Sequence, residues 1–211
     1  MVLKRTVNEK MINVALLGHG IVGSGVAEIL TNNASNIEKK AGKEIYVKYI
    51  LDLRDFSSLP YGNVFVTDCN VILNDPEVDI VVEMLGGLNP AYDFTKSALL
   101  AGKSVVTSNK EVVAEKGDEL LEIARKKNVS YLFEASVGGG IPIIHPLHQC
   151  LVANTISRID GILNGTTNYI LTQMSKHGES FASALKDAQE KGFAEKNPDL
   201  FLLYSFFHLL Q

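Results

Sequence analysis

Tryptophan is absent from the 211 residues, cysteine occurs only twice, and hydrophobic runs are short. Cys69 and Cys150 lie far apart, with no CxxC motif or Cys/His cluster around them. This spacing argues against a disulfide framework and a zinc site, and we interpret both residues as reduced, packed thiols. The longest apolar run, at residues 200–210, contains Ser205 and His208 and is too short to cross a bilayer. The N-terminus has no apolar secretory region, so we expect a cytoplasmic protein.

Positive charge is also scarce, because 20 Lys and Arg residues stand against 24 Asp and Glu residues, giving a formal net charge of −4. No basic cluster interrupts this balance, so neither nucleic acid nor an anionic membrane surface is an expected partner. Small anions are still allowed, because backbone N–H groups bind them without net positive charge. The hydrophobic content of 46% is that of a globular protein, and the length allows one or two domains.

The chain does contain a regular alternation of short β-branched runs and longer amphipathic stretches, which is typical of βαβ units. Because the runs are continuously apolar, they predict a parallel sheet covered on both faces. We therefore expect a doubly wound, Rossmann-like α/β domain over residues 12–145. The expected strands cover residues 13–17, 45–51, 79–83, 104–107 and 129–133, with a short apolar element at 71–73; the expected helices cover residues 22–40, 89–100 (capped by Asn89) and 111–127.

The pattern changes after the glycines at residues 138–140. An alternating stretch at 157–163 predicts a strand, and two amphipathic stretches at 166–176 and 181–191 predict helices. We expect these elements to begin an incomplete α+β domain for substrate binding or dimerisation. This second domain is placed at residues 146–211, with an atypical hydrophobic tail at 199–211.

A glycine-rich motif follows the first expected strand and opens the first expected helix. Its residues are Gly18, Gly20 and Gly23, with Ile21 and Val22 between the last two glycines. In a GxGxxG motif the first glycine allows a tight turn, the second lets a pyrophosphate approach the backbone, and the third allows close helix–strand packing. The order of strand, motif and helix therefore predicts a dinucleotide-binding turn formed by all five residues. The alternative is a glycine-rich turn with no ligand.

The second expected strand ends beside two charged residues that point to different dinucleotides. Asp52 offers a carboxylate to the hydroxyls of an adenosine ribose, as in NAD, whereas Arg54 offers a cation to the 2′-phosphate of NADP. The two indications conflict. The sequence leaves NAD and NADP open, with a small advantage for NAD.

Further polar residues follow the later strands. Thr107, Ser108 and Lys110 come at the end of one strand, and Glu134 comes at the end of the next. Because the carboxyl ends of parallel strands line the ligand crevice, we expect Thr107, Ser108 and Lys110 to contact a cofactor, and Lys110 to donate a proton to a substrate oxygen. The glycine-rich loop at 134–142 can present carbonyl oxygens to a hard cation, although such a loop is more often a flexible connection.

Taken together, these segments resemble the homoserine dehydrogenase family, whose members interconvert L-homoserine and L-aspartate 4-semialdehyde with a nicotinamide cofactor. The resemblance covers about residues 12–198, in the order of the family. The stretches that carry it are VALLGHGIVGSGV, DIVVEMLGGLNP, VVTSNKEVVAEKGDEL, FEASVGGGIPII, GILNGTTNYIL and GFAE followed two residues later by proline.

The resemblance implies a role for each matching position. Lys110 lies between nicotinamide and substrate, and Gly192 lies near the cofactor. Thr166 and Glu195 contact the substrate. The resemblance also implies a homodimer built through the second domain, a role in threonine and methionine biosynthesis, and a sodium ion that braces the domain junction. The implied sodium ligands are Glu134 and the backbone carbonyls of Val137, Gly139 and Ile141.

The sequence departs from the family after Pro198. The family continues with an aspartate-rich stretch and a helix bearing an aspartate and a lysine, whereas residues 199–211 contain no lysine and only Asp199 as an acid. We therefore expect dinucleotide binding but weak or absent turnover of homoserine in this truncated chain. The alternatives are a non-catalytic dinucleotide-binding or dimer-forming module, and another Rossmann dehydrogenase with a different semialdehyde substrate.

Overall fold

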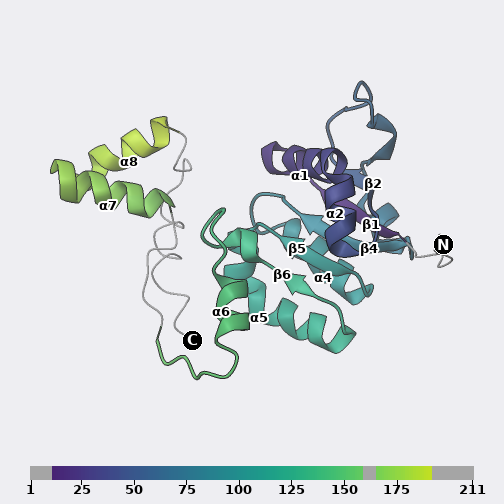
Figure 1. Ribbon diagram of the computed structural model, residues 1–211. Coiled ribbons are helices and arrows are strands. Elements are labelled where there is room, and N and C mark those ends of the chain that lie inside the picture. Colours follow the sequence, from purple (N-terminus) through teal and green to yellow (C-terminus); the bar gives the residue numbers. More distant parts are fainter. Residues whose placement is uncertain (1–10, 159–164, 192–211) are drawn as a thin grey trace, which may run out of the picture. The chain divides into compact units, whose positions relative to one another are not determined.

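The computed structural model describes residues 11–158 and 165–191 (Figure 1). These residues form two compact units, which divide between Phe133 and Glu134, earlier than the position expected from the sequence. Residues 157–158 belong to no strand, and the remainder of the strand expected there lies outside the described residues. Gly192, Glu195 and the tail at 199–211 also lie outside them.

The first unit contains a parallel sheet with the strand order β3-β2-β1-β4-β5-β6. Every neighbouring pair of these strands is parallel. An order in which the chain builds outward from β1 in both directions is that of a doubly wound sheet, so the predicted Rossmann-like fold is confirmed. The strands are β1 (Ile12–Leu17), β2 (Ile45–Leu51), β3 (Phe65–Val66), β4 (Val78–Glu83), β5 (Ser104–Thr107) and β6 (Tyr131–Leu132).

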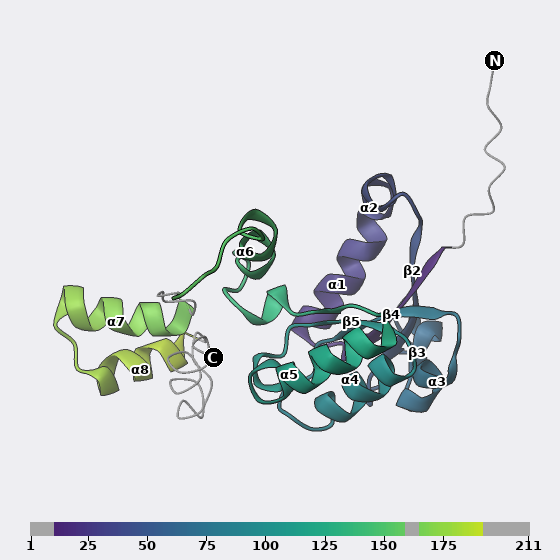
Figure 2. The same cartoon turned by 90° about the horizontal axis from the view of Figure 1, so that it is seen from below.

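Helices cover both faces of this sheet, as Figure 2 shows. Successive side chains of β1 point to opposite faces: Val14 and Leu16 pack with Ala27 of one helix, whereas Ala15 and Leu17 belong to the larger cluster on the other face. All four β1 residues are buried, which explains the continuous apolar run. The helices are α1 (Ile21–Asn32) and α2 (Ala34–Ala41) on the first side, and α3 (Cys69–Asn74), α4 (Ala91–Leu100) and α5 (Lys110–Lys127) on the other.

Two local expectations are wrong, and the sequence assigned no type to a third element. The single helix over 22–40 is two helices, because Asn33 leaves the helical geometry (φ −107°, ψ 14°) and ends α1 while it starts α2. Asparagine favours such boundaries because its side chain competes with helical hydrogen bonding. The short apolar element at 71–73, for which the sequence predicted no type, is part of a helix, α3, which is capped by the carboxylate of Asp68. Asn89 does not cap α4, since Pro90 occupies that position.

The second unit contains three α-helices in its described part. The two expected helices are confirmed, and α6 was not expected. Ile170 packs against Ala184 and Ala188 in a small apolar cluster, and the hydroxyl of Tyr169 donates to the carboxylate of Asp187. These contacts hold two of the helices in an antiparallel pair, as their short connection requires. The helices are α6 (Ile144–Cys150), α7 (Gly165–His177) and α8 (Phe181–Glu190).

The turn from β1 into α1 depends on the absence of a side chain at residue 23. A Cβ atom on Gly23 would lie 2.0 Å from the carbonyl oxygen of Gly18. Gly18 itself has a φ of +97°, in the left-handed region that glycine adopts without strain. The strand and the helix therefore meet backbone to backbone.

We predict that Gly23→Ala lowers the free energy of unfolding by roughly 3 kcal/mol or more, because the backbone of Gly18 cannot yield as a side chain would. Gly25→Ala is the matched control: a Cβ there meets nothing within 4 Å, and alanine should stabilise α1 by up to about 1 kcal/mol. Urea denaturation of both variants measures the difference. Equal stability of the two variants would contradict the backbone contact.

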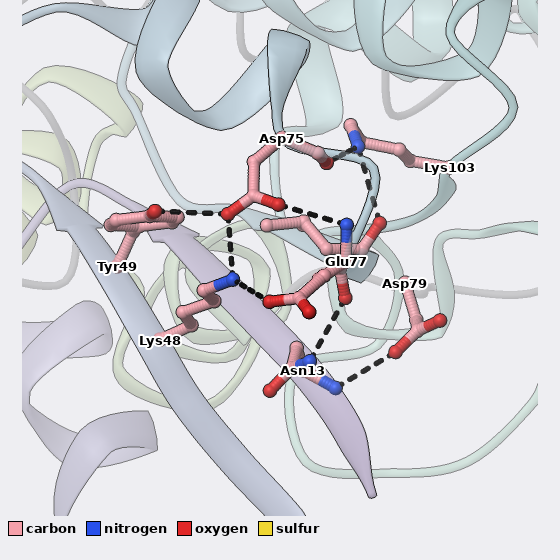
Figure 3. A network of polar contacts seen from close by, with 8 residues as sticks. Asn13, Lys48, Tyr49, Asp75, Glu77, Asp79 and Lys103 are labelled. Carbon is pink, nitrogen blue, oxygen red and sulfur yellow. Dashed lines mark hydrogen bonds and ion pairs between the residues drawn. The ribbon is translucent and has the colours of Figure 1, made fainter. Parts of the chain in front are cut away.

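The opposite, amino edge of the sheet is held by a closed polar network (Figure 3). The buried ammonium of Lys103 donates to the carbonyl oxygens of Asp75 (2.5 Å) and Val78 (3.2 Å). The carboxylate of Asp75 accepts from Lys48 at 2.7 Å and from the Tyr49 hydroxyl at 2.9 Å. Burial lowers the pKa of Lys103. The network therefore joins the middle of β2 to the residues that precede β4 and β5.

We predict that Lys103→Met destabilises the fold by about 2 kcal/mol, because two carbonyl oxygens lose a charged donor worth roughly 1.5–3 kcal/mol each while the burial of the charge is relieved. Lys126→Met is the control, since its ion pair with Glu122 lies on an exposed helix face and is worth less than about 1 kcal/mol. Thermal unfolding compares them. Similar midpoints would show that the Lys103 contacts add nothing.

Candidate functional site

The candidate site lies at the carboxyl edge of the sheet, where several strand ends are joined by backbone hydrogen bonds. The amide of Gly18 donates to the carbonyl of Leu51 at 2.9 Å, and the amide of Met84 donates to the carbonyl of Leu17 at 3.0 Å. The turn after β1 is therefore fixed between the ends of β2 and β4. In a doubly wound sheet this is the position at which ligands bind.

The amino terminus of α1 is open at this edge. Gly20 occupies its N-cap position and provides no side-chain hydrogen bond. The side chains of Ile21 and Val22 are 94% and 53% exposed. The first N–H groups of a helix have no partner within the helix and carry a partial positive charge, so this terminus can accept a phosphate.

Asp52 and Arg54 form one hydrogen-bonded group with the glycine turn. The carboxylate of Asp52 accepts from the Nε and Nη2 atoms of Arg54, at 2.9 and 2.8 Å, and from the amides of Arg54 and His19. The Nη2 atom also donates to the carbonyl of His19 at 3.0 Å. The guanidinium beside Asp52 holds the pKa of that carboxyl far below its usual value. The structure thus brings together the two residues that gave conflicting indications.

The side chain of His19 packs in an aromatic cluster that sequence reasoning missed. Its ring lies edge-on to Phe56 and Phe65, with centroid distances of 4.7 and 5.0 Å, and its Nε2 atom lies 3.3 Å from the Tyr61 hydroxyl. Burial lowers the pKa of His19. The three aromatic side chains come from the loop before β3 and from β3 itself, so only the folded chain brings them to the turn.

A second polar group lies at the ends of β4 and β5. Glu83 is fully buried, and its carboxyl group accepts from the Leu85 amide at 2.7 Å and from the Thr107 hydroxyl at 2.5 Å. Burial raises the pKa of Glu83. Thr107, which was expected to contact the cofactor, is itself fully buried, so its side chain stabilises this edge from inside the protein.

Asn109 links this buried group to the predicted lysine. Its side-chain amide donates to the carbonyls of Leu85 (3.1 Å) and Gly87 (2.7 Å), and its Oδ1 atom caps α5 by accepting from the amide of Glu111. Lys110 is the first residue of α5 and is exposed. The amide of Ser108 donates to the carbonyl of Glu83 at 3.2 Å. Hydrogen bonds on both sides of Lys110 therefore hold the backbone from which its side chain projects.

The residues implied as sodium ligands lie in the second unit. The carboxylate of Glu134 accepts from the amides of Ile143, Ile144 (2.9 Å) and His145 (2.6 Å), so it caps α6. These donors fill three of its roughly four acceptor positions, and they lower the pKa of Glu134. The described residues contain no group of three acidic, His or Cys side chains that could hold a metal. The contacts of this carboxylate give no support to the implied sodium ion, whose other ligands are backbone carbonyls.

The remaining implied ligands of that loop and the implied substrate residue belong to the same unit. Gly138 and Gly139 adopt positive φ angles of 71° and 61°, and Ile141 is 71% exposed. Thr166 lies buried in the first turn of α7. Val137 donates its amide to the carbonyl of Glu134.

Family comparisons cover most of the chain. Residues 18–134 match the model for the NAD-binding domain of homoserine dehydrogenase, and residues 142–200 match the homoserine dehydrogenase domain. The homoserine dehydrogenase of Neisseria gonorrhoeae is 42% identical over 191 residues, or 90% of this chain and 44% of that protein. The homoserine dehydrogenase of Synechocystis is 45% identical over 89% of this chain. The chain thus spans less than half the length of these relatives.

Solved structures agree with these matches. A homoserine dehydrogenase from Thiobacillus denitrificans superposes with a TM-score of 0.82 at 42% identity, over 93% of this chain and 47% of that one. A hyperthermophilic archaeal homoserine dehydrogenase in complex with NADPH gives a TM-score of 0.77 at 29% identity, over 92% of this chain and 67% of that one. Among the described residues, no helix is long and apolar enough to span a membrane. The chain belongs to the homoserine dehydrogenase family.

Proposed function

We propose that the first unit binds NAD or NADP along the carboxyl edge of its sheet, and that the chain is part of an enzyme interconverting L-homoserine and L-aspartate 4-semialdehyde. The observation that carries the proposal is the open amino terminus of α1 beside the Asp52–Arg54 pair. A pyrophosphate at the helix terminus would place an adenosine ribose toward that pair. Dimerisation through the second unit and a cytoplasmic role in threonine and methionine synthesis are proposed from family resemblance alone.

In this proposal the described residues bind the cofactor and orient the substrate. The turn from Gly18 to Gly23 holds the pyrophosphate, and Lys110 holds or moves a proton at the substrate oxygen that is a hydroxyl in homoserine and a carbonyl in the semialdehyde. The nicotinamide, when bound, accepts or donates the hydride. Thr166 and Glu195 are proposed to contact the substrate, and Gly192 to lie near the cofactor. No step is assigned to sodium.

The contacts of Asp52 bear on the choice between NAD and NADP. Its carboxylate already accepts four hydrogen bonds, from the groups of Arg54 and from the His19 amide, so it must give up one of them to bind ribose hydroxyls. Arg54 is 61% exposed and keeps a charged edge toward solvent. We propose that Arg54 binds the 2′-phosphate of NADP, and that without Arg54 the carboxylate is available to the ribose of NAD.

The variant Arg54→Ala is therefore expected to weaken NADPH binding by roughly tenfold or more, the effect of losing one charge-assisted contact. NADH should bind as well as before or more tightly. Fluorescence titration of the reduced nicotinamide measures both affinities. Arg125→Ala is the matched control: this residue lies in the last turn of α5, and its loss should change neither affinity. Equal weakening of NADH and NADPH by Arg54→Ala would rule out a role in distinguishing them.

Turnover provides the test of the proposed reaction. Because the 211 residues span less than half the length of the curated relatives, we expect them to bind NADPH but to oxidise homoserine slowly or not at all. Absorbance of the reduced cofactor follows the reaction, with the Neisseria gonorrhoeae enzyme as the reference. In Lys110→Met, any residual rate should fall by about 10²-fold while NADPH binding persists. A rate close to the reference would contradict the expected slow turnover, and no loss of rate in Lys110→Met would overturn the role proposed for Lys110.

A second candidate is a dinucleotide-binding module without catalysis. One observation favours it: the glycine turn, Asp52, Arg54 and Lys110 all belong to the first unit, which carries its own core. Binding of NADPH with no turnover under any condition would support this second function. Measurable oxidation of homoserine would exclude it.

A further inference from the structure

We infer that Glu83 is a positioning residue at the carboxyl edge of the sheet. Through Thr107 and Asn109 it fixes the loop at residues 84–88 and the start of α5, and it thereby sets the position of Lys110. The inference deepens the proposed function and rests on the binding of a nicotinamide dinucleotide. It assigns a role at this site to a residue other than Lys110 and those of the glycine turn.

The position of Glu83 is unusual for an acidic residue. It ends β4, and its Cα pairs with that of Thr107 at the end of β5. Both side chains are fully buried, and the donors that reach the carboxyl group carry no charge: the Thr107 hydroxyl, the Leu85 amide and the side-chain amide of Asn109. Acidic side chains are rarely buried completely, because desolvation disfavours their charged form. An apolar residue would fill this place without that penalty, so packing alone does not account for the carboxyl group.

From this carboxyl group a chain of hydrogen bonds reaches both flanking loops. The Thr107 hydroxyl donates its proton to Glu83 and accepts from the Asn109 amide at 2.9 Å. A hydroxyl has one proton, so the carboxyl group determines the direction in which Thr107 donates. Asn109 then holds the carbonyls of Leu85 and Gly87 with one end of its side chain, while the other end caps α5.

Lys110 is fixed on both sides by this arrangement. The residue before it is Asn109, and the residue after it is Glu111, whose amide donates to the Asn109 side chain at 3.1 Å. The lysine side chain itself is exposed, so its reach depends on the backbone from which it starts. Loss of the buried contact should therefore disturb the lysine and the loop after Met84 more than the glycine turn, which the carbonyl of Leu51 and the Asp52–Arg54 pair also hold.

Two ligands separate positioning from general stability. NADPH occupies the whole proposed edge, whereas 2′-phospho-ADP-ribose lacks the nicotinamide and needs only the turn and the Asp52–Arg54 pair. Isothermal titration gives both affinities, and the emission of bound NADPH reports the surroundings of the nicotinamide. The variants are Glu83→Gln, which keeps the volume, and Thr107→Val, which removes only the linking hydroxyl. Thr95→Val is the matched control, because Thr95 is equally buried and its hydroxyl has no partner within the described residues.

We expect Glu83→Gln and Thr107→Val to weaken NADPH binding by roughly tenfold and to change its emission, while affinity for 2′-phospho-ADP-ribose stays within about twofold of the unaltered chain. Thr95→Val should change neither. If NADPH and the fragment weaken in proportion, Glu83 is only structural and the inference fails. If neither variant affects NADPH, it also fails. If the unaltered chain binds neither ligand, the proposed function itself is wrong, and the inference falls with it.

Discussion

The contact between Gly23 and the carbonyl of Gly18 determines how the first helix leaves the sheet. With no Cβ at residue 23, α1 packs directly against the end of β1, and its uncapped amino terminus faces the carboxyl edge. The adenosine side of the candidate site follows from the same packing. His19 lies within this turn, its amide binds Asp52, and its carbonyl accepts from Arg54. A displaced helix would disturb phosphate binding and the charged pair together.

Much of this architecture could be predicted from the sequence, because strands buried on both faces are continuously apolar. The runs ending at Leu17, Leu51, Glu83 and Thr107 correspond to strands of the sheet nearly residue for residue. The two edge strands were harder: β3 was missed and β6 is shorter than expected, since each has two residues and so little pattern to recognise. The break between α1 and α2 at Asn33 was not predicted, because a single asparagine is a weak signal within a long amphipathic stretch.

The site was predictable where it follows from topology and unpredictable where it follows from packing. Carboxyl ends of parallel strands share one edge, so the glycine turn, Asp52, Arg54 and Lys110 could be assigned to it. Local sequence gives no indication that the Glu83 carboxyl is buried, because an acid at a strand end is usually solvated. The helix cap made by Glu134 spans several residues of irregular loop, and no helix-start motif adjoins it.

The two edges of the sheet use charge in different ways, and the difference explains why one of them suits a ligand. At the amino edge, Lys103 and Lys48 are enclosed by carbonyls and carboxylates of the same network. At the carboxyl edge, the buried Glu83 group supports loops from behind, while the amino terminus of α1 and the side chains of Arg54 and Lys110 face solvent. Groups enclosed within the protein gain little from a ligand, whereas exposed groups on a rigid support can exchange water for a phosphate or a substrate oxygen with little reorganisation.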